Sequence, residues 1–290
     1  MLSAMSGDEQ LINAYKQKKD LYATMAARIH HNDYWDNMEA YQDGTPNPEG
    51  KKRRSAIKKL VLAILYGMGA DSLSIDLNIS KEEAQKLIDD FYAGYPTVYK
   101  FIEGNKESVH KYGYVKGILG RRRRLPDALL PKYTIKRVGG TTNNFNPFLF
   151  TDNVSKLRED DLVKKYREKL SATKGWREAQ TIISDAKKDG VIITNNGGFI
   201  SRAERQSTNA IIQGGAATIT KLAMINVDSD KELKELGFRL LITVHDELIG
   251  ECPNENSDKV AKRLSQVMIE SAAKVCTVPM KCDCYKLFVA

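Results

Sequence analysis

The sequence predicts an α+β protein in which helices dominate. Several long segments repeat apolar residues at helical spacing, and two short apolar runs at 240–244 and 248–252 flank a tight turn. A chain of 290 residues is long enough to bury a substantial core in one large domain or two smaller ones. We therefore expect a helical body with an antiparallel hairpin near the C-terminus.

The basic residues of the chain are clustered. The net charge is +8, the pI is near 9.1, and Lys and Arg fill 51–54 and 121–124. Such clusters favour a polyanionic partner, most often nucleic acid, with a solvated basic face as the alternative for either run alone. Asp8 and Glu9 stand where a signal peptide needs basic and apolar residues, and no apolar run reaches bilayer length. The sequence thus predicts a soluble, intracellular protein with no membrane partner.

Four cysteines lie late in the chain, at Cys252, Cys276, Cys282 and Cys284. We interpret them as reduced thiols. A zinc site is the weaker alternative, because only the Cys282-Asp-Cys284 spacing hints at one and no His lies nearby.

The first part of the chain is predicted to form helices in succession. Residues 8–30 show helical spacing and form one helix or two, and the Pro and Gly residues of 44–50 form a loop. A helix then starts near Lys51, buries an apolar stripe over 57–65 and ends near Gly67.

Further helices and a strand follow. Ser80 and Glu83 have the spacing of a capping box, which predicts a helix that closes before Pro96. Another helix is expected over 96–112. The apolar-polar alternation of 114–120 then predicts a strand with a Gly-bounded end.

The character of the chain changes at 127–198, which is irregular, Asn-rich and then charged. We interpret this stretch as an inserted subdomain with a helical pair within 154–188. A long helix rich in Ala, Gln and Asn is predicted over 202–224, and another over 256–274 follows the hairpin. A short strand is expected at the end of the chain.

One helix carries a stripe suited to a polyphosphate. Arg54, Lys58, Leu62 and Tyr66 recur every four positions, so each is rotated by about 40° and raised by about 6 Å from the last. Two cations about 6 Å apart can span neighbouring phosphates, Arg as a fork and Lys as a point charge. The alternative is that these side chains only snorkel at the rim of the core.

A second helix carries a hydrogen-bonding stripe. Arg205, Asn209 and Gln213 also recur every four positions, and Gly214 and Gly215 follow. Such side chains can donate to the acceptors that every base pair shows in the minor groove, and glycine allows close backbone approach. Ordinary polarity of a helix surface is the alternative.

Three polar residues occupy the turn of the predicted hairpin: His245, Asp246 and Glu247. A carboxylate at a tight turn can hold a divalent ion without burying charge in the core. An ordinary polar turn would have the same composition.

The order of these pieces resembles the polymerase domain of family A DNA polymerases, the class of bacterial DNA polymerase I and many phage enzymes. The resemblance rests on five ordered motifs: RRSAIKKLVLAILYG, FYAGYPTV, GYVKGILGRRRRLPD, ERQSTNAIIQGGAA and VHDELIGE.

The resemblance implies a right-hand polymerase fold with a fingers subdomain, a partial palm and no thumb. Residues 1–50 are then the helices that join palm and fingers, 51–126 the fingers, and 199–290 the palm with its hairpin. Over residues 127–198 the family commonly has only a short connection. The many Lys and Arg residues of this stretch suggest contact with duplex DNA, with a solvated insertion as the equal alternative. The implied compartment is the cytoplasm of a bacterial or phage-infected cell.

The family's nucleotide-binding roles carry over to the first stripe. Arg54 and Lys58 are similar to the cations that grip the phosphates of the incoming dNTP, and Lys58 is also implied to be catalytic. Tyr66 resembles the residue beside the nascent base pair, and Gly67 the neighbour that leaves room for the template base. The family expects an aromatic residue where Leu62 stands, so altered sugar selection is implied there.

The family's DNA-binding roles carry over to the second stripe and to the second basic run. Arg205, Asn209 and Gln213 are similar to the minor-groove contacts that check the primer-template duplex. Arg121 and Arg122 are implied to contact DNA as well.

The resemblance also implies the reaction, which is attack of a primer 3′-hydroxyl on the α-phosphate of a dNTP with two Mg²⁺ ions. His245 resembles the residue near the primer end, Asp246 the metal-binding carboxylate, and Glu247 its neighbour. The family's second metal-binding Asp belongs to a motif just upstream of Met1, which is not in this sequence. We expect a separate N-terminal polymerase chain, or a longer version of this one, to supply that Asp and the thumb.

Two other interpretations stay open at the level of sequence. One is a non-catalytic fragment or subunit that only grips primer-template DNA. The other is a single-subunit RNA polymerase, although Glu247 and the Arg205, Asn209 and Gln213 stripe favour the DNA enzymes.

Overall fold

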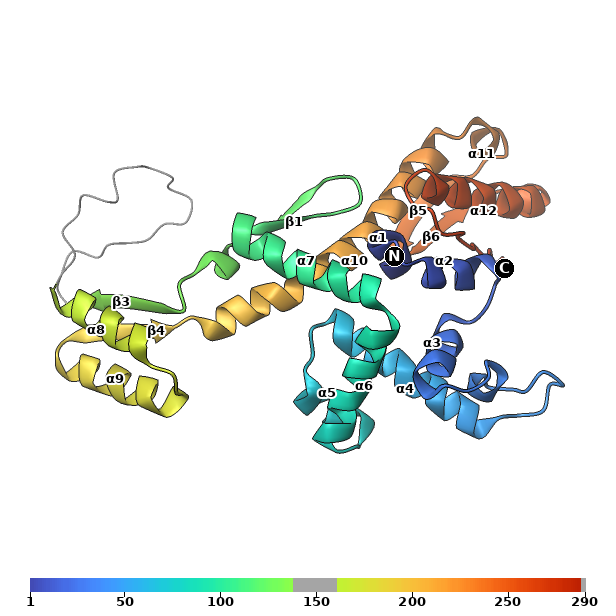
Figure 1. The fold of residues 1–290 in the computed structure, drawn as a ribbon. Coiled ribbons are helices and arrows are strands. Elements are labelled where there is room, and N and C mark those ends of the chain that lie inside the picture. Colours follow the sequence, from blue (N-terminus) through green and yellow to red (C-terminus); the bar gives the residue numbers. More distant parts are fainter. Residues whose placement is uncertain (138–160, 288–290) are drawn as a thin grey trace. The chain divides into compact units, whose positions relative to one another are not determined.

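The computed structural model describes residues 1–137 and 161–287 (Figure 1). In this part of the chain the fold is helix-rich, with three two-stranded sheets. The chain divides into two compact units: the first contains 1–107, 115–123 and 205–290, and the second contains 108–114 and 124–204. The predicted α+β class with dominant helices is confirmed.

The first unit opens with short capped helices. The side chain of Asp8 accepts a hydrogen bond from the backbone N–H of Leu11, and Asp20 accepts one from Ala23. Each Asp therefore starts a helix, so residues 8–30 form two helices. In order, these elements are α1 (Leu2–Ser6), α2 (Glu9–Lys16), α3 (Leu21–His30) and the 3₁₀ turn η1 (Trp35–Asn37).

Helix α4 (Pro48–Leu65) begins before the predicted Lys51. Asn47 accepts a hydrogen bond from the N–H of Gly50, and Pro48 occupies the first turn, where its missing N–H costs nothing. The apolar stripe of α4 is buried in a core formed with α3 and the helices that follow. Those helices are α5 (Ala70–Leu77), α6 (Lys81–Gly94) and α7 (Pro96–Tyr112).

The predicted capping box is present at the start of α6. The Ser80 hydroxyl accepts from the N–H of Glu83 at 3.1 Å, and the Glu83 carboxylate accepts from the N–H of Ser80 at 2.9 Å. Phe91 from α6 is fully buried, and its ring lies 5.3 Å from that of Tyr95. The helices predicted over 80–96 and 96–112 are present, whereas α5 was not predicted.

The segment after α7 is a two-stranded ribbon. Strand β1 (Tyr114–Lys116) pairs with β2 (Arg122–Arg124), so the second basic run is itself a strand. Only the first of these strands was predicted, because a run of four arginines carries no strand-like alternation of polarity.

The C-terminal part of the first unit packs on one long helix. Helix α10 (Gly197–Ser229) starts five residues before the predicted helix and ends five residues after it. A core of Val227, Leu233, Val260, Leu264 and Val267 joins it to the elements that follow. These are α11 (Lys231–Glu235), β5 (Arg239–Val244), β6 (Glu247–Glu251), η4 (Asn254–Asn256) and α12 (Ser257–Ala273).

The expected strand at the end of the chain is wrong for the residues described. Residues 275–287 contain no strand. Instead, the hydroxyl of Ser265 on α12 donates to the carbonyl oxygen of Cys282 at 2.7 Å, which ties the segment to a helix.

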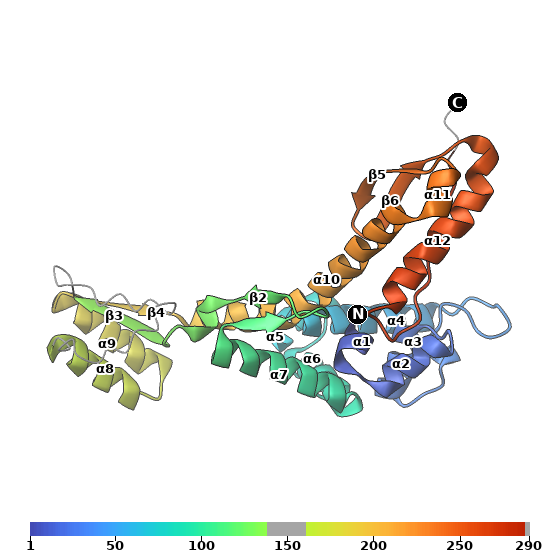
Figure 2. The same ribbon diagram turned by 90° about the horizontal axis from the view of Figure 1, so that it is seen from above.

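The second unit is a small α/β layer. Strands β3 (Tyr133–Arg137) and β4 (Val191–Asn195) pair antiparallel, and α8 (Asp161–Ala172) and α9 (Trp176–Lys188) pack against them (Figure 1; Figure 2). The 3₁₀ turn η2 (Pro126–Leu129) precedes β3.

This unit has a core of its own. Its buried side chains are Tyr166, Leu170, Ala179, Ala186, Val191 and Ile193. The predicted helical pair is present over 161–188, and residues 154–160 of that prediction lie outside the described part. The two strands were not predicted.

Helix α10 is long and apolar enough, by length and composition alone, to cross a membrane. The same helix carries the Arg205, Asn209 and Gln213 stripe, and it also buries Ser207 and Thr208. Asn105 of α7 donates a hydrogen bond to the Thr208 hydroxyl at 3.3 Å. At this turn α10 therefore packs against protein through polar side chains.

Candidate functional site

The first predicted stripe lies on the exposed side of α4. Lys58 is exposed, and the side chains of Leu62 and Tyr66 are 39% and 45% exposed. Lys58 makes no ion pair within 1–137 and 161–287. Because the opposite side of α4 is packed in the core, Lys58 and Leu62 are held on a rigid helix, and Tyr66 is partly exposed at its C-terminal cap.

Arg54, the fourth member of the stripe, is held by carboxylates. Its guanidinium lies 2.7 Å from Asp20 and 3.2 Å from Glu39, and it stands 5.7 Å from the centre of the Tyr22 ring. The other oxygen of Asp20 caps α3 by accepting from Ala23. Arg54 therefore joins α4 to the start of α3, a contact that the sequence did not predict.

This ion pair shifts the protonation of both partners. Burial alone raises the pKa of Asp20, but hydrogen bonds from Arg54 and Ala23 outweigh it and hold that pKa below its usual value. The same hydrogen bond raises the pKa of Arg54. Asp20 is thus a carboxylate at neutral pH.

The two predicted stripes meet at the end of α4. The Gln213 amide donates to the Tyr66 hydroxyl at 3.2 Å. Gly67 has a φ of +67°, and a Cβ built on it would lie 2.4 Å from Cγ of Arg205. A side chain at this glycine would therefore collide with the stripe of α10.

The second stripe is accessible along α10. Arg205 and Gln213 are exposed and Asn209 is half-buried. Nothing lies within 4 Å of a Cβ built on Gly214, whereas at Gly215 that Cβ would lie 2.3 Å from the Met1 side chain. Gly214 leaves the backbone open to a ligand, and Gly215 allows the N-terminal residue to pack.

The hairpin has the predicted turn at its tip. Val244 pairs with Glu247, so His245 and Asp246 form the turn between β5 and β6. His245 has a φ of +55°, a positive value of the kind common at the first central residue of two-residue hairpin turns. All three residues of the triplet are exposed.

The donor set at the tip fits one metal-binding carboxylate and not a complete two-ion site. An exposed Asp246 offers the oxygen ligand that Mg²⁺ prefers. Within the described residues no group of three or more His, Cys, Asp or Glu side chains could hold a metal ion. Two ions about 3.5 to 4 Å apart need carboxylates from more than one element, so these residues do not hold both.

The remaining predicted site residues belong neither to the two stripes nor to the hairpin turn. Arg121 and Arg122 are exposed on the β1–β2 ribbon. Across the part of the chain that the structure describes, no hydrogen bond or ion pair links the tip at 245–247 to the α4 stripe.

The cysteines do not form a metal centre in the described residues. All four are free thiols, and only Cys276 is buried. The Cys282 thiol lies 3.6 Å from the sulfur of Met268. The interpretation as reduced thiols fits this arrangement.

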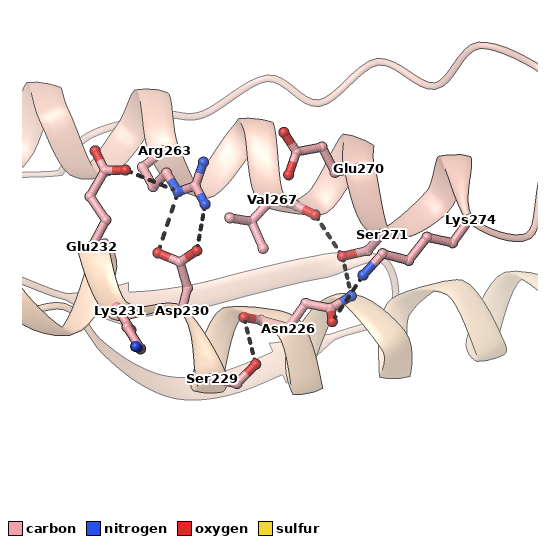
Figure 3. Close-up of a pocket in the computed structure, with 10 residues that line it drawn as sticks. All are labelled: Asn226, Ser229, Asp230, Lys231, Glu232, Arg263, Val267, Glu270, Ser271 and Lys274. Carbon is pink, nitrogen blue, oxygen red and sulfur yellow. Dashed lines mark hydrogen bonds and ion pairs between the residues drawn. The ribbon is translucent and has the colours of Figure 1, made fainter.

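A polar pocket lies elsewhere, between the end of α10, α11 and α12 (Figure 3). Three of its charged groups pair with one another: Arg263 lies 2.7 Å from Asp230 and 3.2 Å from Glu232. The Asn226 amide donates to the Ser271 hydroxyl at 2.7 Å. None of the predicted site residues lines this pocket, and its hydrogen bonds serve to pack α10 on α12.

Known proteins resemble this chain over nearly its whole length. A model of the family described as DNA polymerase family A matches residues 1–146 and 155–286. DNA polymerase I of Chloroflexus aurantiacus is 29% identical over 268 residues, which cover 92% of this chain and 20% of that protein. The thermostable DNA polymerase I of Thermus thermophilus is 30% identical over 271 residues, covering 92% of this chain and 23% of that protein.

A solved structure shares the fold. It is the POL domain of Pol1 from M. smegmatis in complex with DNA primer-template and dNTP. The match has a TM-score of 0.60 at 22% identity and covers 93% of this chain and 34% of that chain. This similarity supports the right-hand polymerase fold.

This chain matches only part of the length of each curated relative. The chain spans about a fifth to a quarter of the length of the curated relatives it matches, at 20% and 23% for the two named above. Because the family match runs across both ends and the middle of the sequence, the chain belongs to DNA polymerase family A.

Proposed function

We propose that this chain takes part in template-directed DNA synthesis, transferring a nucleotide from a dNTP to a primer 3′-hydroxyl. The observation that carries the proposal is the junction of the two stripes, where Tyr66 contacts Gln213 and Gly67 contacts Arg205. If α4 faces the nucleotide and α10 faces the duplex, their contact allows both helices to contact the same base pair. Little covalent work falls to such a site, and positioning and charge neutralisation dominate.

The nucleotide would bind along α4. Lys58 is exposed and has no ion-pair partner among the described residues, so its charge is available to a phosphate. Arg54 can offer the donors that Asp20 and Glu39 leave open, because a guanidinium has five N–H groups. Leu62 and Tyr66 would face the sugar and base.

Primer-template DNA would bind along α10 and the basic ribbon. Arg205, Asn209 and Gln213 would donate to the minor groove, with Arg121 and Arg122 on the backbone. The M. smegmatis polymerase domain is in complex with both DNA primer-template and dNTP, which supports the same partners here.

Catalysis would depend on divalent metal ions, and we assign Asp246 as a Mg²⁺ ligand with His245, Glu247 and Lys58 as its catalytic neighbours. When bound, the ions would stabilise the attacking and leaving oxygens. We place the second carboxylate ligand and the thumb on a separate N-terminal polymerase chain or polymerase segment. The site of action would be the cytoplasm of a bacterial or phage-infected cell.

We assign the subdomains on the same basis. Residues 1–50 would join palm to fingers, 51–126 would form the fingers, 127–198 an inserted subdomain, and 199–290 the palm. The second compact unit covers most of this insertion, which supports treating it as separate.

Primer extension tests the proposal. The chain is mixed with the N-terminal portion of a family A polymerase, a primed template, dNTPs and Mg²⁺, and extension is followed on a gel. We expect Asp246→Asn to abolish extension while leaving primer-template affinity within about twofold, since only a tip carboxylate changes. Wild-type extension rates in Asp246→Asn would overturn the assignment.

A second candidate is a DNA-binding subunit without catalysis. It is favoured by the incomplete metal donor set in the described residues. In that case the chain binds primer-template with the α10 stripe, and no N-terminal portion restores extension.

A further inference from the structure

The second compact unit holds most of the net charge of the chain. Its residues, 108–114 and 124–204, contain 16 Lys and Arg against 10 Asp and Glu, a net +6 of the +8 in the whole chain. The described residues of the unit carry 14 Lys and Arg against 7 Asp and Glu and fold around a buried core, so their charge is displayed by a folded module. A surface of this kind attracts polyanions.

An unpacked tryptophan stands at one end of this module. Trp176 is the first residue of α9 and is 72% exposed. The inward side of α9 buries Ala179 and Ala186, three and ten residues further on, while Trp176 lies beyond the edge of that core. A large indole that lies mostly outside the core is available to stack on a ligand.

Two cations flank this ring in sequence. Lys174 and Arg177 are exposed, and neither makes an ion pair within the described residues. Other cations of the module are engaged, since Lys165 lies 3.5 Å from Asp189 and Lys188 lies 2.9 Å from Asp185. Glu178 is the acidic neighbour of this group, so the tip keeps a net positive charge.

We propose that the tip of the α8–α9 hairpin, defined by Lys174, Trp176 and Arg177, binds single-stranded DNA. The indole would stack on an unpaired base, and the two cations would neutralise adjoining phosphates. A duplex buries the faces of its bases, so an exposed ring at a helix end suits a single strand. The inference uses the proposed function only to choose DNA over other polyanions.

The tryptophan content of the chain makes the contact directly observable. The chain has two tryptophans, and Trp35 lies in the first unit, on η1. In the full chain carrying Trp35→Phe, all indole fluorescence comes from Trp176. We expect an oligo(dT) of about 12 nucleotides to quench this fluorescence, with an affinity that falls as salt rises.

Variants separate stacking from charge. Using anisotropy of a labelled oligo(dT), we expect Trp176→Ala to weaken binding by about 5- to 140-fold, the range for one stacked base, and Trp176→Phe to retain most of the affinity. Lys174→Ala with Arg177→Ala should reduce the salt slope by about 1.4, at about 0.7 per phosphate contact. The matched control, Lys164→Ala with Lys187→Ala, removes the same charge from the opposite end of the hairpin and should change binding less than twofold.

Three results would overturn the inference: equal quenching by duplex DNA, equal quenching by inorganic polyphosphate, or unchanged affinity in Trp176→Ala. Circular dichroism and urea unfolding of each variant check that helix content and stability are unchanged. The test is independent of the polymerase reaction, because Asp246→Asn should leave the quenching of Trp176 unchanged even though it abolishes extension.

Discussion

The contact between Asp20 and Arg54 gives the most direct test of how the two helices are joined. Asp20 has two roles: one oxygen accepts from the N–H of Ala23 at 2.9 Å, and the other lies 2.7 Å from the guanidinium of Arg54. Asp20→Ala removes both roles. Asp20→Asn retains an oxygen that can cap the helix but removes the charge.

The two roles of Asp20 should make separate contributions to the free energy of unfolding. An N-cap contributes about 1 kcal/mol. A charge-assisted hydrogen bond in a site where both side chains are about one-quarter exposed contributes about 1.5 kcal/mol. We therefore expect Asp20→Ala to lower the free energy of unfolding by about 2.5 kcal/mol and Asp20→Asn by about 1.5 kcal/mol.

Urea unfolding at pH 7, followed by circular dichroism, measures these losses. Glu39→Gln is the matched control, because Glu39 also contacts Arg54, at 3.2 Å, but its side chain is 51% exposed. This substitution should lower the free energy of unfolding by less than about 0.5 kcal/mol. If Asp20→Asn is as stable as wild type, the ion pair does not hold α4 to α3. If Asp20→Asn and Asp20→Ala lose the same amount, the cap contributes nothing.

The pH dependence follows from the lowered pKa of Asp20. A carboxyl whose pKa is lower in the folded protein stabilises it fully above the unfolded-state value near 3.8. That stability is lost as the pH falls through the folded pKa. The difference between wild type and Asp20→Asn should therefore be constant from pH 5 to 7 and shrink below about pH 4.

Three further substitutions test the site and the core. Leu62→Tyr should raise the use of dideoxynucleotides in primer extension by the reconstituted enzyme, and an unchanged preference would count against Leu62 facing the sugar. Gly67→Ala should lower the free energy of unfolding by about 1 to 2 kcal/mol through its positive φ and its collision with Arg205, whereas Gly69→Ala, with open space around it, should cost much less. Phe91→Ala empties a fully buried position and should cost about 3 to 5 kcal/mol in the same urea assay.

Sequence alone predicted the elements whose signal is local. The apolar stripe of α4 and the capping box at Ser80 each depend on residues within a turn or two of one helix. Both are present as predicted. Helix α4 begins earlier than predicted, because Asn47 and Pro48 form its N-terminal cap and the apolar stripe does not extend that far.

The features that sequence missed depend on distant partners. Strands β3 and β4 pair residues more than fifty positions apart, with Tyr133 opposite Asn195. Arg54 and Asp20 are 34 positions apart, and no local pattern marks them as neighbours. The hairpin turn was predictable from its residues, whereas the role of Asp246 as a metal ligand stays a prediction, because a two-ion site depends on groups from several elements.

The hydrogen bond between Gln213 and Tyr66 has a thermodynamic consequence. If dNTP binding at Tyr66 breaks or strengthens this bond, the affinity of the α10 stripe for duplex must change. Linkage then requires that duplex change the affinity for dNTP by the same factor. A single side-chain contact would thus make nucleotide and duplex reciprocal effectors of one another, and removal of the Gln213 amide would uncouple them.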